Sequence, residues 1–268
     1  MAVGGIGQVK TMRVEFFKSL WGFEAMEPAQ FIDKAQKAGY HGFESPMVLS
    51  KADIQSSQLL YIAQGFCETV ESVQSSIDQA TELGAILLNL HVGKDYWSED
   101  HTYRFLEGSC RAVEQCPIPV TFETHRGRLF YSAQSTSRIL SQFPQIRLTA
   151  DFSHWTCVSE SMLQDQAAEL EEAMQRTIYI HARVGHEEGP QVSDPREEAW
   201  ASHVERFETW WSRIAEIQRN AGAEVLRIDP EYGPPNYMTI DPRTNEPIAD
   251  LWDVCLAMRD RLESFFAG

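Results

Sequence analysis

The chain has 268 residues, of which 43% are hydrophobic and 23% charged, and its formal net charge is −16. This composition predicts a globular protein with one large core, and the negative charge argues against nucleic acids and anionic membranes as partners. The five cysteines form no CxxC pair, no apolar run is long enough to span a bilayer and the N-terminus lacks a signal-peptide pattern, which together predict a cytoplasmic protein with reduced thiols.

Short apolar runs alternate with amphipathic segments along the chain. Residues 1–11 are rich in Gly and are predicted to be a flexible lead-in. The helix predicted at about residues 52–58 is short, so the strand that follows it is the least clearly marked. The apolar runs predict eight strands, at Arg13–Lys18, Tyr40–Glu44, Leu59–Ala63, Ile86–His91, Val120–Thr124, Arg147–Phe152, Thr177–Arg183 and Glu224–Asp229.

Helix boundaries are signalled at several points between these strands. Gly39 and Gly84 each follow a helical pattern and are predicted to end it. The pair Asp194-Pro195 predicts the start of a helix, because Asp can cap and Pro suits the first helical position. Apolar residues spaced from Ile248 to Phe265 predict the last helix.

Eight strand–helix units within residues 12–268 have the size and order of a (β/α)₈ TIM barrel, which is the predicted α/β fold. A doubly wound open sheet is the alternative. The first strand is not followed by the Gly-rich sequence that usually accompanies such a sheet, which favours the single barrel.

One metal-capable side chain stands near the end of each of the last four predicted strands: Glu123, Asp151, His181 and Glu231. In a barrel these strand ends form one face, and neighbouring strands lie about 4.8 Å apart. A shared divalent cation would remove the cost of placing such groups against apolar runs. Three carboxylates and one imidazole suit Mn²⁺ first, with Mg²⁺, Co²⁺ or Zn²⁺ as alternatives.

The two glutamates have a second interpretation, as structural carboxylates paired with Arg128 and Arg227. Other polar side chains near strand ends are predicted to reach the substrate. Glu44 ends the second strand and could instead pair with Lys18 or Lys51. His91, at the end of the fourth strand, and Trp155, after the sixth, are also predicted to reach the substrate, and His125 is a predicted catalytic residue. Loop hydrogen bonds are the alternative for the two histidines, and core packing is the alternative for the tryptophan.

The motifs of the second half resemble those of the xylose-isomerase-like TIM barrels, the sugar phosphate isomerase/epimerase family. They are Glu123 on the fifth strand, Asp151-Phe152-Ser153-His154, Ile180-His181-Ala182-Arg183, and Glu231 on the eighth. The resemblance implies that Glu123, Asp151, His181 and Glu231 bind the metal. It also implies that His154 and Arg183 hold substrate oxygens, and that Glu123 and Glu231 act as acid and base on opposite faces of a sugar.

The activity implied is a metal-dependent isomerase or epimerase that abstracts a proton beside a carbonyl of a carbohydrate or polyol and passes through an enediolate. His125, two residues after Glu123, departs from the ketose 3-epimerases and would suit a lyase that eliminates across a keto sugar, as in 3-keto glycoside cleavage or inosose dehydration. A non-catalytic sugar-binding barrel is a third interpretation. The charge and the eight histidines argue against the endonuclease IV branch, and relatives of this kind often form homo-oligomers.

Overall fold

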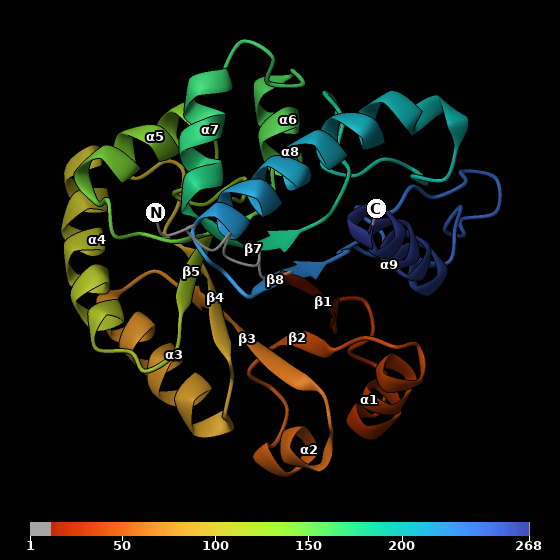
Figure 1. The fold of residues 1–268 in the computed structure, drawn as a ribbon, viewed down its shortest axis with the longest axis horizontal. Helices are drawn as coiled ribbons and strands as arrows, with labels where there is room; N and C mark the ends of the chain where they lie inside the picture. Colours follow the sequence, from red (N-terminus) through yellow and green to blue (C-terminus); the bar gives the residue numbers. More distant parts are fainter. Residues whose placement is uncertain (1–11, 268) are drawn as a thin grey trace, which may run out of the picture.

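In the computed structural model, which describes residues 12–267, every strand pairs in parallel with its neighbour in sequence. The first strand pairs with the last, from Arg13 opposite Val225 to Phe16 opposite Ile228, and this pairing closes the sheet into a barrel (Figure 1). The strands are β1 (Arg13–Ser19), β2 (Gly42–Pro46), β3 (Leu60–Cys67), β4 (Leu87–Val92), β5 (Val120–Glu123), β6 (Leu148–Ala150), β7 (Thr177–His181) and β8 (Val225–Asp229). All eight predicted strands are present, the (β/α)₈ barrel is confirmed and the open sheet is excluded.

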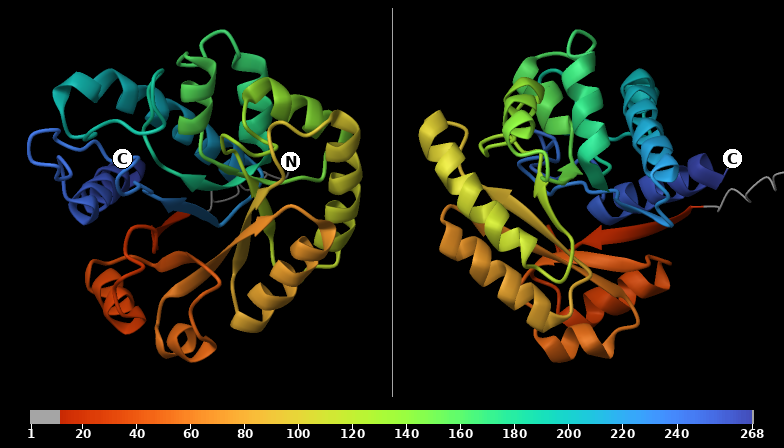
Figure 2. Two further views of the ribbon diagram at one scale, coloured as in Figure 1. Left: turned by 180° about the vertical axis from the view of Figure 1, so that it is seen from behind. Right: turned by 60° about the vertical axis from the view of Figure 1, so that its left-hand side comes forward.

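The helices surround the barrel on its outer side (Figures 1 and 2). They are α1 (Pro28–Lys37), α2 (Lys51–Ser56), α3 (Val70–Leu83), α4 (Glu99–Glu114), α5 (Ala133–Gln142), α6 (Ser153–Ser159), α7 (Ala167–Arg176), α8 (Ala201–Asn220) and α9 (Leu251–Ala267), with a 3₁₀ turn, η1, at Glu198–Trp200. None of the helices in residues 12–267 has the length and hydropathy needed to cross a membrane. The predicted lead-in, residues 1–11, lies outside the described residues.

The predicted helix boundaries are correct at the glycines and wrong at Asp194. Gly84 caps α3 in the left-handed conformation, with φ of 80°. The helix expected after Asp194-Pro195 begins only at Ala201, after η1. The reason is that the Asp194 carboxylate accepts hydrogen bonds from the backbone N–H and the guanidinium of Arg196, at 2.9 and 2.8 Å, and so closes a local turn. The last helix likewise begins at Leu251, three residues after Ile248.

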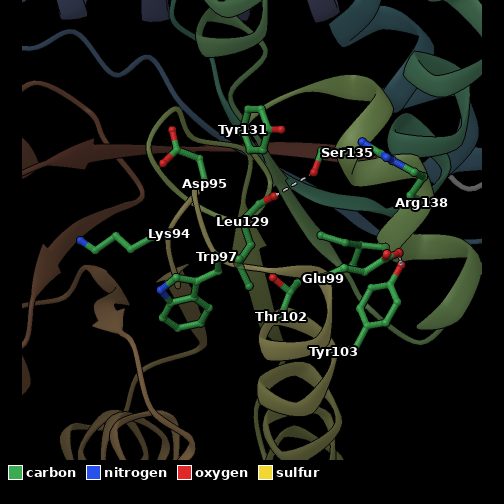
Figure 3. A pocket seen from close by; sticks show the side chains of 11 residues that line it. Lys94, Asp95, Trp97, Glu99, Thr102, Tyr103, Leu129, Tyr131, Ser135 and Arg138 are labelled. Atoms are coloured by element: carbon green, nitrogen blue, oxygen red, sulfur yellow. Dashed lines mark hydrogen bonds between the residues drawn. The ribbon is translucent and has the colours of Figure 1, made fainter.

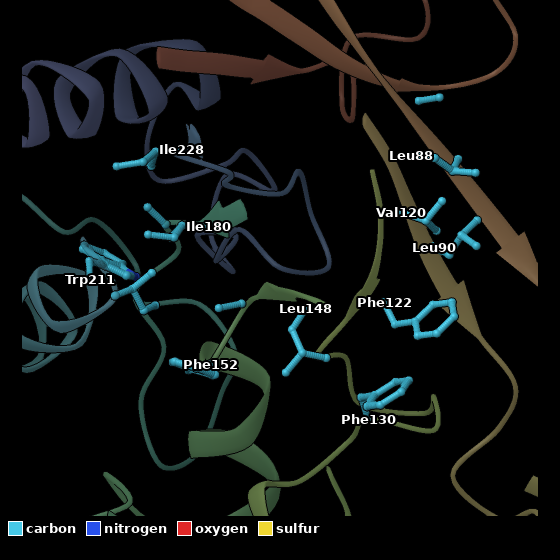
Figure 4. Close-up of a cluster of buried hydrophobic side chains, with 14 of the residues drawn as sticks. Leu88, Leu90, Val120, Phe122, Phe130, Leu148, Phe152, Ile180, Trp211 and Ile228 are labelled. Carbon is cyan, nitrogen blue, oxygen red and sulfur yellow. The ribbon is translucent and has the colours of Figure 1, made fainter. Parts of the chain in front are cut away.

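Two layers of apolar side chains hold the barrel together. Successive strand residues point to opposite faces, so Leu88 and its counterparts Phe122, Leu148 and Ile228 face the helices in the main core (Figure 4). A smaller cluster of Phe17, Ile62, Leu87 and Tyr179 fills the inside of the barrel. Because this cluster occupies the interior, polar side chains at the carboxyl ends of the strands stand above an apolar floor.

Candidate metal centre and substrate pocket

The four predicted ligands lie at the carboxyl end of the barrel, where parallel strands bring their ends together. Glu123 and His181 are the last residues of β5 and β7, Asp151 follows β6 directly, and Glu231 comes two residues after β8. All four side chains are buried. Three buried carboxylates and one imidazole in one place require compensation by counter-charges or by a cation.

His181 is at the centre of this group. Its Nδ1 lies 3.4 Å from an oxygen of Glu231 and 3.5 Å from an oxygen of Glu123. This Nδ1 atom is buried and has no hydrogen-bond partner. One potential ligand atom each from Asp151, His181 and Glu231 lie within 4.8 Å of one another. An unpartnered imidazole nitrogen facing carboxylate oxygens is the donor set that a divalent cation needs, so Asp151, His181 and Glu231 fit the predicted metal. Glu123 belongs to neighbouring groups of the same kind, one with His181 and Glu44 and one with Asp151 and His154.

The charges at this centre influence one another strongly. Burial raises the pKa of Glu123, but His91 and His181 outweigh it and hold that pKa below the usual range. Burial also raises the pKa of Glu231, but His181 and Arg183 outweigh it and lower that pKa to about 2. Burial lowers the pKa of His181, and the carboxylates of Glu44, Glu231 and Glu123 reverse this and raise it. Both glutamates are therefore ionised at neutral pH, as metal ligands must be.

The suggested structural pairings of the two glutamates are not formed. Arg128 contacts Glu68 at 3.5 Å, and Arg227 contacts Glu15 at 3.4 Å. These arginines are thus engaged elsewhere, which leaves Glu123 and Glu231 facing the centre of the barrel mouth.

Arg183 and His154, the two residues expected to hold substrate oxygens, are joined to Asp151. The Arg183 guanidinium donates to the Asp151 carboxylate and to Ser153 Oγ, the latter at 3.1 Å. Its Nη2 also donates to His154 Nε2, 2.8 Å away. The third guanidinium nitrogen, Nη1, is buried and makes no hydrogen bond, although it lies 3.6 Å from an oxygen of Glu231. A donor therefore remains for a substrate oxygen.

Three histidine rings form one wall of the site. His91 and His125 have ring centroids 4.9 Å apart, and those of His125 and His154 are 3.8 Å apart. The Nδ1 of His125 lies 2.6 Å from the backbone carbonyl of Arg126. A carbonyl only accepts, so Nδ1 carries the proton and a neutral His125 has a lone pair on Nε2. Burial, with a further contribution from His91, lowers the pKa of His125 to about 3.

A cavity of about 300 Å³ opens over this wall and the metal centre. Its lining includes five of the predicted residues, which are His91, Glu123, His125, Arg183 and Glu231. Trp21, Phe66 and Tyr237 add aromatic surface. Trp21 and Tyr237 pack edge to face at 4.8 Å, and both rings lie near the Arg183 guanidinium. The pocket thus combines carboxylates, imidazoles and one guanidinium with flat apolar surfaces, a combination suited to a ligand with hydroxyl groups and an apolar ring face.

The sequence gives little indication that Phe66 and Tyr237 belong to this aromatic surface. Phe66 belongs to the apolar run of β3, yet it is 54% exposed and stacks on His91 with the ring centroids 4.7 Å apart. Tyr237 lies in the loop after β8, 14 residues before α9 begins at Leu251. Trp21 packs against Gly233, where a Cβ atom would lie 2.3 Å from the indole ring. Only the folded chain brings these three residues together.

Three of the predicted substrate residues do not line this pocket. One of them, His154, is fully buried and accepts a hydrogen bond from Arg183 Nη2. Glu44 is fully buried beneath the ligands and does not line the pocket; neither Lys18, which donates to the Ser19 carbonyl, nor Lys51 pairs with it. Trp155 is also fully buried, in the main core, where its Nε1 donates to the carbonyl of Phe130 at 2.9 Å. The reason is that α6 begins at Ser153, and successive helical residues point about 100° apart, so His154 faces the site and Trp155 turns away.

Trp155→Phe is expected to reduce stability without changing substrate binding. Phenylalanine preserves most of the packing but leaves the buried Phe130 carbonyl without its donor, which costs about 1–3 kcal/mol. Urea unfolding measures the loss, and the KM of the folded variant should equal that of the parent protein. An increase in KM at unchanged stability would contradict this prediction and would show that Trp155 contributes to substrate binding.

A second cavity, of about 160 Å³, lies between α4, α5 and the loops that precede them (Figure 3). Lys94, Trp97, Tyr103, Tyr131 and Arg138 are among its lining residues. None of the predicted ligands or substrate residues is part of this lining. The predicted chemistry is therefore concentrated in the larger cavity at the barrel mouth.

Comparisons with known proteins place this architecture among solved barrels. The probable 3-DHS dehydratase AsbF of Bacillus anthracis matches with a TM-score of 0.60 and 12% identity over 93% of this chain and 98% of its own. The 3-keto-D-glucoside 4-epimerase YcjR of E. coli matches with a TM-score of 0.56 and 12% identity over 96% and 100%. Endonuclease IV of Thermus thermophilus matches with a TM-score of 0.51 and 15% identity over 84% and 94%.

No protein-family model matches the sequence. No curated protein matches it either. At identities of 12–15% the structural matches show a common fold. The chain therefore shares the (β/α)₈ barrel fold with endonuclease IV, AsbF and YcjR.

Proposed function

We propose that this protein is a metal-dependent isomerase or epimerase that acts on a carbohydrate or polyol by proton abstraction beside a carbonyl. The observation that carries the proposal is that oxygens of Glu123 and Glu231 lie 3.5 and 3.4 Å from His181 Nδ1, with both glutamates in the lining of one cavity. Two of the structural neighbours are named as an epimerase and a dehydratase, which supports an enzyme of this general kind.

Glu123, Asp151, His181 and Glu231 would hold the cation. When bound, it would polarise the substrate carbonyl and supply several kcal/mol of stabilisation to the developing enediolate. Glu231 or Glu123 removes the proton from the carbon beside the carbonyl, and the other carboxylate returns a proton from the opposite face. Such proton transfer contributes about 10²–10⁴-fold to the rate.

The remaining residues of the pocket orient the substrate. Arg183 Nη1 donates to a substrate oxygen, while Asp151 fixes the guanidinium from behind. His125 Nε2 accepts a hydrogen bond from a hydroxyl, since its Nδ1 is committed to the Arg126 carbonyl. Trp21 and Tyr237 cover the apolar face of the sugar and keep water from the reacting carbon.

The lyase alternative requires a different protonation state of His125. Elimination requires a general acid for the departing oxygen, and His125 would supply it only with a second proton, on Nε2. His125 lines the cavity together with Glu123, and this position is the observation that favours the lyase as the second candidate function.

A substrate panel tests the proposal and separates it from its competitors. Free ketoses, inososes and 3-keto glycosides are incubated with the Mn²⁺-loaded protein in D₂O, and a sample treated with a chelator is the control. We expect deuterium at the carbon beside the carbonyl of the recovered sugar together with an isomer or epimer. An ultraviolet-absorbing ene-product would establish the lyase instead. Tight sugar binding with neither deuterium exchange nor product would establish a binding protein.

A further inference from the structure

A layer of hydrogen-bonded polar side chains lies directly beneath the candidate metal centre. We call it the polar layer; it consists of Glu44, Asn89, Thr121, Thr149 and Tyr179, one residue from each of β2, β4, β5, β6 and β7. All five are buried. A buried carboxylate and amide are costly unless their hydrogen bonds are made, so the partners of Glu44 and Asn89 indicate what the layer does.

Glu44 accepts three hydrogen bonds. Its Oε2 receives the hydroxyl of Tyr179 at 2.6 Å and lies 2.9 Å from His181 Nε2, and its Oε1 receives the Asn89 amide at 3.1 Å. An ionised carboxylate only accepts, so the proton of this contact belongs to His181 Nε2. The nitrogen left for a cation is Nδ1, the atom that faces Glu123 and Glu231.

Asn89 extends the connection to a second candidate ligand. Its Nδ2 donates both to Glu44 and to Glu123 Oε2, the latter at 2.7 Å. Thr121 Oγ1 lies 3.5 Å from the Asn89 carbonyl oxygen and accepts from Thr149 Oγ1 at 2.7 Å. These contacts fix which way the amide points. Glu44 and Asn89 therefore connect His181 to Glu123 and fix the orientation of the two side chains relative to each other.

We propose that Glu44 is a positioning residue of the metal centre, which holds the His181 ring with Nδ1 toward the cation and, through Asn89, sets the orientation of Glu123. The proposal rests on the proposed function in that it requires Glu123 and His181 to be ligands. Glu44 contacts no substrate in this role. The partners of metal-bound histidines commonly act in this way, and their loss typically weakens metal binding about 10- to 100-fold.

Glu44→Gln is the informative substitution, because it keeps the shape and removes the charge. The glutamine amide has one acceptor where Glu44 has two. Placing its oxygen toward Tyr179 and His181 brings its NH₂ group against the NH₂ group of Asn89, and the contact to Glu123 is disturbed. We expect Mn²⁺ to bind the variant about 10- to 100-fold more weakly in isothermal titration calorimetry.

Glu15→Gln is the matched control. Glu15 is a carboxylate buried near the start of β1, at the opposite end of the barrel, where it contacts Arg13 and Arg227. The same chemical change there should leave Mn²⁺ affinity unchanged. A general loss of stability from any buried Glu→Gln substitution would affect both variants equally and would overturn the specific role of Glu44.

A spectroscopic measurement on the parent protein does not depend on any variant folding. In Zn²⁺-loaded protein with ¹⁵N-labelled histidine, we expect a proton on His181 Nε2 and none on Nδ1. Metal on Nε2 would overturn the proposal. If the parent binds Mn²⁺ and Zn²⁺ and Glu44→Gln binds them equally well, the role of Glu44 is wrong and the metal centre stands. If the parent binds neither ion, both proposals are wrong.

Discussion

Glu231→Gln is expected to reduce turnover by about 10²–10⁴-fold while the protein stays folded. The amide cannot accept the proton from the carbon beside the carbonyl, and this transfer is worth that factor. Glutamine also replaces a negative oxygen 3.4 Å from His181 Nδ1. Steady-state kinetics on the substrate found in the panel measures the loss, and circular dichroism confirms the fold. Glu68→Gln, a change in a half-exposed carboxylate after β3 that pairs with Lys94, is the control and should retain parental turnover.

Removal of the cation should have the same consequence as removal of Glu231. Elemental analysis of the purified protein is expected to give close to one divalent ion per chain. Dialysis against a chelator should abolish turnover, and Mn²⁺ should restore it. Full activity in both the chelated protein and Glu231→Gln would refute the mechanism.

Arg183→Met is expected to lower the free energy of unfolding of the metal-free protein by about 3–5 kcal/mol. Arg183 and Asp151 form a buried ion pair, and removing one partner leaves an uncompensated buried charge. Methionine fills much of the space of the arginine stem, so the loss reports the charge rather than a cavity. Urea unfolding of parent and variant measures the difference.

Two comparisons sharpen this prediction. Arg213→Met removes the partner of Glu171 and Glu216 on the surface, where ion pairs contribute about 0.2–1 kcal/mol. Saturating Mn²⁺ should stabilise the Arg183→Met protein, because an ion that binds only the folded state shifts the unfolding equilibrium. Equal losses for the two arginine variants would show that the Arg183–Asp151 pair contributes no more than a surface pair.

The barrel could be predicted from the sequence because its signals are local and repeat eight times. Even the weakest predicted strand appears, as β3, which pairs with both β2 and β4, and the short helix α2 before it starts with a capping box of Ser50 and Asp53. Asp194 misled the prediction because a capping residue before proline looks the same whether its carboxylate meets a helix or, as here, the guanidinium of Arg196.

The candidate ligands could be placed at one end of the barrel because each ends or closely follows a strand. Their depth and direction could not be deduced in the same way. Glu44 ends the predicted second strand, but β2 continues to Pro46, so the Glu44 side chain lies below the pocket and contacts Tyr179 and Asn89. Trp155 turns away because α6 starts two residues before it. Both outcomes depend on the residue at which an element begins or ends, which the apolar pattern does not fix.

The apolar floor of the barrel has a consequence for how reactants move. Phe17, Ile62 and Leu87 are fully buried and, together with the ring of Tyr179, whose hydroxyl belongs to the polar layer, they close the interior of the barrel. The substrate of the proposed reaction would therefore enter, and its product leave, through the one opening that Phe66, Trp21 and Tyr237 line. Product and substrate would occupy the same cavity of the free protein, so inhibition by product should be competitive with respect to the substrate.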